Sequence, residues 1–174
     1  MKKVILIGGR LAAGKTTLAK NLSKELNIPY FYKDILKERL GDIFGFNSRE
    51  ENLKLSKGAF EILYHISEQM AENEKPFILE SNFRQNELDK LEKLFKENGY
   101  EIVSLKLTGD EKILYQRYLD RFENENRSVV HANFNSFDEF EEYQQMLSEV
   151  NYPGRVIKID TTEFKKLEEI LKLI

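Results

Sequence analysis

The chain has 174 residues, a length that suits one domain with a substantial core. It has no cysteine, which excludes disulfides and thiolate metal sites. Its net charge of −3 argues against binding of long nucleic acid through bulk positive charge. No apolar stretch approaches the roughly 18 residues that read as a membrane span. We therefore expect a cytoplasmic protein that does not bind membranes.

The N-terminal residues predict a strand, a glycine-rich loop and a helix. The strand is the β-branched apolar run Lys3–Ile7, which is typical of a strand buried on both faces. The loop, Gly9–Thr16, reads G-R-L-A-A-G-K-T and matches the phosphate-binding pattern G-x-x-x-x-G-K-[ST] at every position. Leucines at helical spacing then predict a helix over Lys15–Leu26. This order of elements is the context that the motif requires.

Each position of the loop has a physical role in binding ATP and Mg²⁺. The backbone N–H groups form a concave nest for phosphate, and the start of the helix adds its positive dipole end. Lys15 can reach the β- and γ-phosphates, and the Thr16 hydroxyl can ligate Mg²⁺. Glycines at positions 9 and 14 permit positive φ. The predicted nucleotide-binding residues are Gly9, Ala12, Ala13, Gly14, Lys15, Thr16 and Thr17.

Apolar runs alternate with longer amphipathic stretches along the rest of the chain, which predicts a parallel sheet with helices on both faces. The further strands are expected at Tyr30–Tyr32, Pro76–Glu80, Glu101–Leu107 and Arg155–Ile159. The further helices are expected at Asp34–Leu40, Glu50–Asn73, Gln85–Asn98, Asp110–Phe122, Asp138–Leu147 and Thr162–Leu173. Residues 1–174 are thus expected to form a single α/β domain.

Polar residues follow the second and third strands, where ligands bind in open α/β sheets. Asp34 can accept a proton from an attacking hydroxyl, or it can cap the following helix, and both roles are compatible. Glu80 can hold the Mg²⁺ shell or the substrate; its alternative role is to cap a turn. Asn82 and Arg84 lie just beyond it, and Arg84 is either a bidentate anion ligand or a solvated surface arginine.

Two further segments are candidates for the acceptor pocket and for a lid. Specificity is expected in residues 40–57, where Phe44, Phe46 and Asn47 could line the pocket. A basic cluster follows the fourth strand and contains Arg117, Arg121 and Arg127. Arg121 or Arg127 could neutralise charge on the transferring phosphoryl group from a lid over about residues 122–134. The alternative is a solvated basic helix face, and His131 is expected to be structural.

The chain resembles the small P-loop kinases related to polynucleotide 5′-kinase, zeta toxins and chloramphenicol phosphotransferase. The resemblance rests on G-R-L-A-A-G-K-T-T, on Y-K-D-I-L-K-E-R-L, on F-I-L-E-S-N-F and on the arginines of the lid. It covers nearly the whole chain in order. It implies a P-loop NTPase three-layer sandwich around a five-stranded parallel sheet of order 2-3-1-4-5.

The resemblance also implies roles for single residues. Asp34 corresponds to the general base, and Lys37 stands where polynucleotide kinases place an arginine that binds the acceptor's phosphate. Glu80 and Asn82 correspond to an acid and an asparagine after the third strand. The lid arginines of the family would fall on Arg121 or Arg127, and residues 160–162 fall where such proteins often contact adenine.

The function expected from the sequence is transfer of the γ-phosphoryl group of ATP to a hydroxyl of a small-molecule acceptor. One alternative is a polynucleotide or nucleotide-sugar kinase. Another is a nucleotide-binding protein that hydrolyses ATP poorly, although such a protein would not need a base such as Asp34. The acceptor and the oligomeric state are left open by the sequence.

Overall fold

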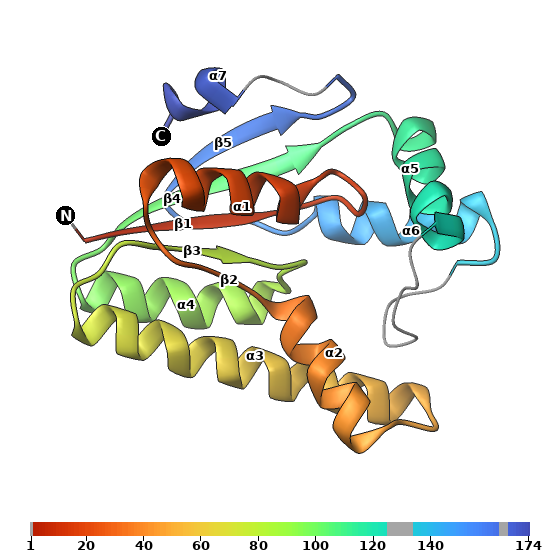
Figure 1. Cartoon of the computed structure of the whole chain (residues 1–174), viewed down its shortest axis with the longest axis horizontal. Coiled ribbons are helices and arrows are strands. Elements are labelled where there is room, and N and C mark those ends of the chain that lie inside the picture. Colours follow the sequence, from red (N-terminus) through yellow and green to blue (C-terminus); the bar gives the residue numbers. More distant parts are fainter. Residues whose placement is uncertain (1, 125–133, 164–166) are drawn as a thin grey trace.

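The computed structural model describes residues 2–124, 134–163 and 167–174, and its centre is a five-stranded sheet (Figure 1). All strand pairs are parallel, and the order is β2-β3-β1-β4-β5, as predicted. The strands are β1 (Lys3–Gly9), β2 (Tyr30–Tyr32), β3 (Phe77–Glu80), β4 (Glu101–Thr108) and β5 (Arg155–Asp160). The predicted P-loop NTPase fold is therefore confirmed.

Helices cover both faces of the sheet and complete a three-layer sandwich (Figure 1). The helices are α1 (Lys15–Leu26), α2 (Lys33–Phe44), α3 (Arg49–Glu72), α4 (Gln85–Glu97), α5 (Glu111–Asn124), α6 (Phe137–Ser148) and α7 (Leu167–Leu171). One core cluster joins the sheet to α1, α5, α6 and α7, and the other joins it to α3 and α4. The central strand β1 contributes to both clusters.

The alternation of side chains along β1 explains these two cores. Ile5 and Ile7 point to the face covered by α1, whereas Val4 and Leu6 point to the face covered by α3 and α4. All four side chains are at most 1% exposed. A strand buried on both faces therefore needs the continuous apolar run that the sequence has here.

Some boundaries differ from the prediction. β1 continues through Gly8 and Gly9 because both residues pair with β4. α2 runs to Phe44 rather than Leu40 and ends at Gly45, whose φ of 65° is favourable only for glycine. The described last helix is shorter than expected, and residues 164–166 lie outside the described part.

The carboxyl ends of β1, β2 and β3 lead directly into the loop before α1, into α2 and into the loop before α4. In Figure 1 α2, α5 and α6 lie at this end of the sheet, so segments far apart in the sequence come together here. Within the described residues, no helix is long and apolar enough to cross a membrane.

Candidate active site

The loop between β1 and α1 has the backbone geometry that the sequence predicts. Gly9 and Gly14 have φ values of 114° and 80°. A Cβ atom on Gly9 would overlap the backbone carbonyl oxygen of Leu107 on β4, so position 9 requires glycine for space as well as for φ. Ala12 also has a positive φ, 58°, which the sequence did not indicate. An alanine in this region is strained and must be held by its surroundings.

The Lys15 side chain is buried and folded back over the loop. Its Nζ atom donates to the carbonyl oxygen of Arg10 at 2.7 Å and lies 3.5 Å from that of Gly9. These carbonyl oxygens solvate the ammonium group inside the protein. The side chain therefore already lies at the concave side of the loop, where phosphate would bind.

Thr16 and Glu80 join the start of α1 to the end of β3. The Thr16 hydroxyl donates to Glu80 Oε2 at 2.8 Å. The hydroxyl oxygen of Thr16 and the carboxylate oxygens of Glu80 are the type of ligand that Mg²⁺ prefers. Mg²⁺ uses few protein ligands and keeps several waters. The described residues contain no group of three or more acidic or histidine side chains that could form a closed metal site. Thr16 and Glu80 would therefore supply only part of the ligands of a Mg²⁺ ion.

Glu80 is 3% exposed, and its pKa is raised from 4.5 to about 7. Burial is the main cause, and the charge of Asp34 adds to it. The charges of Lys15 and Arg121 and the hydrogen bond from Thr16 oppose this increase. These electrostatic effects place Asp34, Lys15 and Arg121 around one carboxyl group.

Asp34 is the second residue of α2, and the N-cap of that helix is Tyr32. The alternative interpretation of Asp34 as an N-cap is therefore wrong. Its negative charge raises the pKa of both Glu80 at the end of β3 and Tyr143 of α6.

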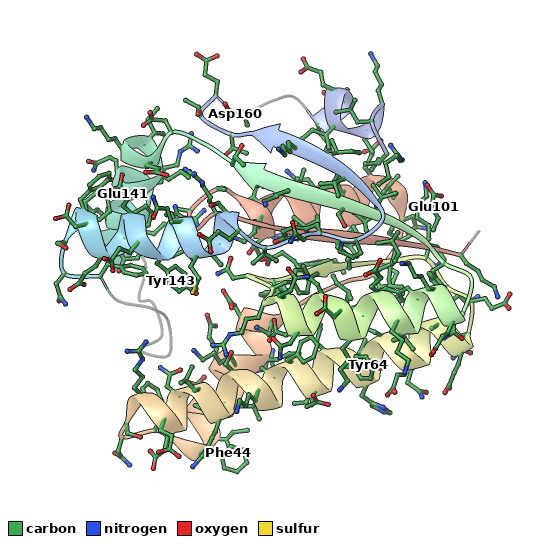
Figure 2. The ribbon with its side chains drawn as sticks, turned by 180° about the vertical axis from the view of Figure 1, so that it is seen from behind. Phe44, Tyr64, Glu101, Glu141, Tyr143 and Asp160 are labelled. Carbon is green, nitrogen blue, oxygen red and sulfur yellow. The ribbon has the colours of Figure 1, made fainter. Side chains whose placement is uncertain are left out.

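A cavity of about 1550 Å³ opens beside this loop, between the N-terminal halves of α2 and α3 and helix α6. The predicted site residues that line it are Ala12, Asp34, Lys37, Asn82, Arg84 and Arg121, and the predicted pocket residues are Phe46 and Asn47. The prediction for Phe44 is wrong. Its side chain projects outward near the end of α2 and is 73% exposed, because the helix continues to this residue (Figure 2).

The cavity carries several cations. Lys37 is half-buried, and its pKa is lowered by burial, while Lys33 and Arg84 lower it further and Asp34 opposes them. Arg84 is exposed and lies at the N-cap of α4.

The buried Oδ1 atom of Asn82 has no hydrogen-bond partner among the described residues. A ligand group that donates a hydrogen bond would satisfy this oxygen.

The arginines of the basic cluster after β4 have different surroundings. Arg121 lines the cavity, and its charge lowers the pKa of Glu80. Arg117 instead donates to the carbonyl oxygens of Thr161 and Thr162, so it supports the loop after β5. Asp160 caps that loop by accepting from the Thr162 N–H and lies at the end of β5 (Figure 2). Arg127, His131 and most of the predicted lid lie outside the described residues.

Two interactions at the site were missed in the sequence. Lys33 Nζ binds both carboxylate oxygens of Glu87 at 2.9 and 3.1 Å, and both side chains are buried. This ion pair fixes the start of α2 to the start of α4. The Gln144 amide binds the backbone of Leu11 in the phosphate-binding loop. The position of Lys33 next to Asp34 was a weak indication of the ion pair with Glu87. No sequence pattern indicates the contact between Gln144 and Leu11.

Comparison with solved structures supports the kinase fold. A candidate kinase from Chloroflexus aurantiacus is 25% identical, with a TM-score of 0.86 over 98% of this chain and 95% of that chain. A structure of the PezAT chromosomal toxin–antitoxin system of Streptococcus pneumoniae is 18% identical, with a TM-score of 0.63, covering 100% of this chain and 78% of that chain. A gluconokinase from Sinorhizobium meliloti is 16% identical, with a TM-score of 0.59, covering 98% and 88%.

No curated protein sequence matches the chain. The family model described as zeta toxin matches residues 1–163, which include the loop, Asp34, Glu80 and Arg121. These residues, the sheet order and the kinase-like neighbours all point to a P-loop kinase. The chain belongs to the zeta toxin family.

Proposed function

We propose that the protein transfers the γ-phosphoryl group of ATP to a hydroxyl group of a small-molecule acceptor. The observation that carries this proposal is the single cavity that Asp34 shares with Leu11 and Ala12 of the phosphate-binding loop. A module that only binds nucleotide needs no carboxylate facing the loop across a large cavity. The zeta toxin family match and the kinase-like neighbours support the same reaction class.

Each residue has one task in the proposed reaction. Lys15 exchanges the Arg10 carbonyl for phosphate oxygens, and the loop N–H groups bind the β-phosphate. The hydroxyl oxygen of the acceptor attacks the γ-phosphorus, and the bond between this phosphorus and the leaving oxygen of ADP breaks. Asp34 accepts the proton of the attacking hydroxyl. Arg121 neutralises charge on the transferring group. Mg²⁺ held through Thr16 and Glu80 would add charge neutralisation on the phosphates.

The cations of the cavity favour an acceptor that carries an anionic group. Lys37 and Arg84 both line the cavity, and the charge of Arg84 lowers the pKa of Lys37, whereas that of Asp34 raises it. The guanidinium group of Arg84 has the fork that binds a carboxylate or phosphate with two hydrogen bonds. A bound anion would lower the repulsion between the two cations.

The test is a phosphoryl-transfer screen with release of ADP as readout. Hydroxyl metabolites with and without an anionic group are compared with 5′-hydroxyl oligonucleotides. Transfer to an anionic small molecule supports the proposal, and transfer only to oligonucleotides replaces it with the polynucleotide kinase alternative. If ATP binds but no hydroxyl compound is phosphorylated, the protein is a binding module and the proposal is wrong.

Arg84→Met tests the anionic group separately, with Lys93→Met as a matched control on the exposed face of α4. The Arg84 variant should raise the KM of the acceptor by about 10–100-fold, the effect of one charge-assisted hydrogen-bond pair, and leave the affinity for ATP unchanged. An unchanged KM would show that Arg84 is a solvated surface residue.

A further inference from the structure

Gln144 of α6 binds both backbone groups of Leu11 in the phosphate-binding loop. Its Oε1 atom accepts a hydrogen bond from the Leu11 N–H at 2.8 Å, and its Nε2 atom donates to the Leu11 carbonyl oxygen at 3.3 Å. The side chain is fully buried. Only a side-chain amide has a donor and an acceptor spaced to match both groups of one peptide residue.

The contact lies at the strained part of the loop. Leu11 directly precedes Ala12, whose φ of 58° is unfavourable for an alanine. The loop N–H groups bind phosphate only if they converge, and this requires the backbone around Ala12 to keep its unusual conformation. A bidentate contact at Leu11 fixes the peptide groups next to this residue, whereas α1 contacts the preceding part of the loop through Lys15, whose Nζ atom binds the carbonyl oxygens of Gly9 and Arg10.

Helix α6 also forms a wall of the acceptor cavity. Tyr143 lies next to Gln144 on α6, lines the cavity and is near enough to Asp34 for that charge to raise its pKa (Figure 2). Met146 and Leu147, one turn further along, also line it. One helix therefore contacts the nucleotide-binding loop through Gln144 and the acceptor cavity through its neighbouring residues.

We propose that Gln144 is a positioning residue that holds the apex of the phosphate-binding loop in its nucleotide-binding conformation, and that it couples the loop to the acceptor cavity through α6. The proposal rests on the proposed function only in that the loop binds nucleotide. Gln144 need not touch the nucleotide. Its removal should relax the loop around Ala12 and weaken binding of phosphate.

The test compares Gln144→Met with Gln145→Met, the same substitution at the adjacent, exposed position of α6. Methionine keeps the volume of glutamine and removes both hydrogen bonds. We expect Gln144→Met to weaken binding of a non-hydrolysable ATP analogue with Mg²⁺ by about tenfold, the usual effect of one to two neutral hydrogen bonds. The Leu11 amide should exchange its hydrogen about tenfold faster in the nucleotide-free protein. Gln145→Met should change neither quantity.

The coupling is measured on the same variants with an acceptor found in the screen. Wild-type protein should bind the acceptor more tightly when the ATP analogue is bound. The ratio of the acceptor Kd without the analogue to the Kd with it should be smaller in Gln144→Met. Gln145→Met should retain it. An equal ratio in all three proteins would overturn the coupling.

Melting temperatures of the nucleotide-free variants separate positioning from support of the whole fold. If Gln144→Met melts early but its folded form binds the analogue as wild type does, Gln144 is a core residue and the proposal is wrong. If Gln144→Met does not fold, Gln144→Asn replaces it, because asparagine keeps the amide but is one methylene shorter and withdraws it from Leu11. The same weakening supports the proposal, and wild-type affinity overturns it. A wild-type protein that fails to bind the analogue would instead contradict the proposed function.

Discussion

Single side chains at the carboxyl end of the sheet determine the proposed chemistry. Lys15 is held by the carbonyl oxygens of its own loop, so the ammonium group is already placed for phosphate. Asp34 and Glu80 lie close enough for the charge of one to raise the pKa of the other. Burial is the main cause that raises the pKa of Glu80 to about 7.

Lys15→Ala should reduce turnover by at least about 10²-fold, because the ammonium group that would contact the β- and γ-phosphates is lost. The nucleotide-free fold should persist, since the two carbonyl oxygens that Lys15 binds lie at the concave side of the loop, where water can bind them. Initial rates and a melting curve check both statements. Wild-type phosphoryl transfer by this variant would contradict the role of the loop.

Asp34→Asn should lower kcat by about 10²–10⁴-fold, the usual effect of a positioned acid or base. Asparagine keeps the size of the side chain, so ATP affinity should change little. Isothermal titration with an ATP analogue and steady-state rates separate the two effects. A loss of nucleotide binding would instead assign Asp34 to the metal ion.

Glu80 predicts a pH dependence of stability in the absence of metal. Its folded pKa of about 7 lies above the unfolded value of 4.5, so the folded protein binds the proton more tightly. The contribution to the free energy of unfolding is complete below pH 4.5 and is lost as the pH rises through 7, by about 3 kcal/mol. Denaturant unfolding in chelator at pH 5 and pH 8 measures this change. Glu80→Gln should remove it, and an equal change in that variant would assign the dependence to other groups.

At the scale of the elements, contacts between helices that are distant in the sequence shape the site. The ion pair of Lys33 and Glu87 joins α2 to α4, and Glu87 also accepts from the Arg84 N–H at 3.0 Å. One carboxylate therefore fixes the helix that carries Asp34 and the segment that carries Arg84. The contact of Gln144 with Leu11 adds α6 to the same arrangement.

Lys33→Met should reduce the free energy of unfolding by about 3–5 kcal/mol, because it leaves the buried Glu87 carboxylate without its cation. Lys54→Met is the matched control, since its pair with Glu50 is exposed and should contribute less than about 1 kcal/mol. Denaturant unfolding measures both variants. Equal small losses would show that the Lys33 pair adds no more than a surface pair.

At the scale of the whole molecule, two apolar cores enclose a parallel sheet and leave its carboxyl end to the site. The cavity draws its walls from α2, α3, α5 and α6 and from the loops after β1 and β3, so no single segment contains it. A ligand that bridges these elements must stabilise the native state, because the unfolded chain cannot bind it.

ATP analogue with Mg²⁺ at about 100 times its Kd should raise the free energy of unfolding by about 2.7 kcal/mol. For a chain of this length, that corresponds to an increase in Tm of about 5–10 °C. Differential scanning fluorimetry checks the shift, and Lys15→Ala should reduce it. An equal shift in both proteins would indicate nucleotide binding elsewhere.

The sequence determined the fold and the nucleotide-binding loop, because both depend on local patterns. The apolar run of β1 and the spacing of Gly9, Gly14 and Lys15 are readable within one short segment. The positions of Asp34, Glu80 and Arg84 after their strands could also be predicted, since parallel strands end at a common edge. The roles of these residues and the single-domain organisation remain predictions.

Only the tertiary structure decided which side chains meet. Lys33 and Glu87 are 54 positions apart, and Leu11 and Gln144 are 133 apart, so no local pattern could pair them. Arg117 and Arg121 lie on one helix, yet one binds backbone carbonyls and the other lines the cavity. Because α2 continues to Phe44, the side chain of that residue is exposed to solvent and does not line the cavity. The physical reason is that local patterns specify which elements form, whereas packing of the elements specifies which groups come within contact.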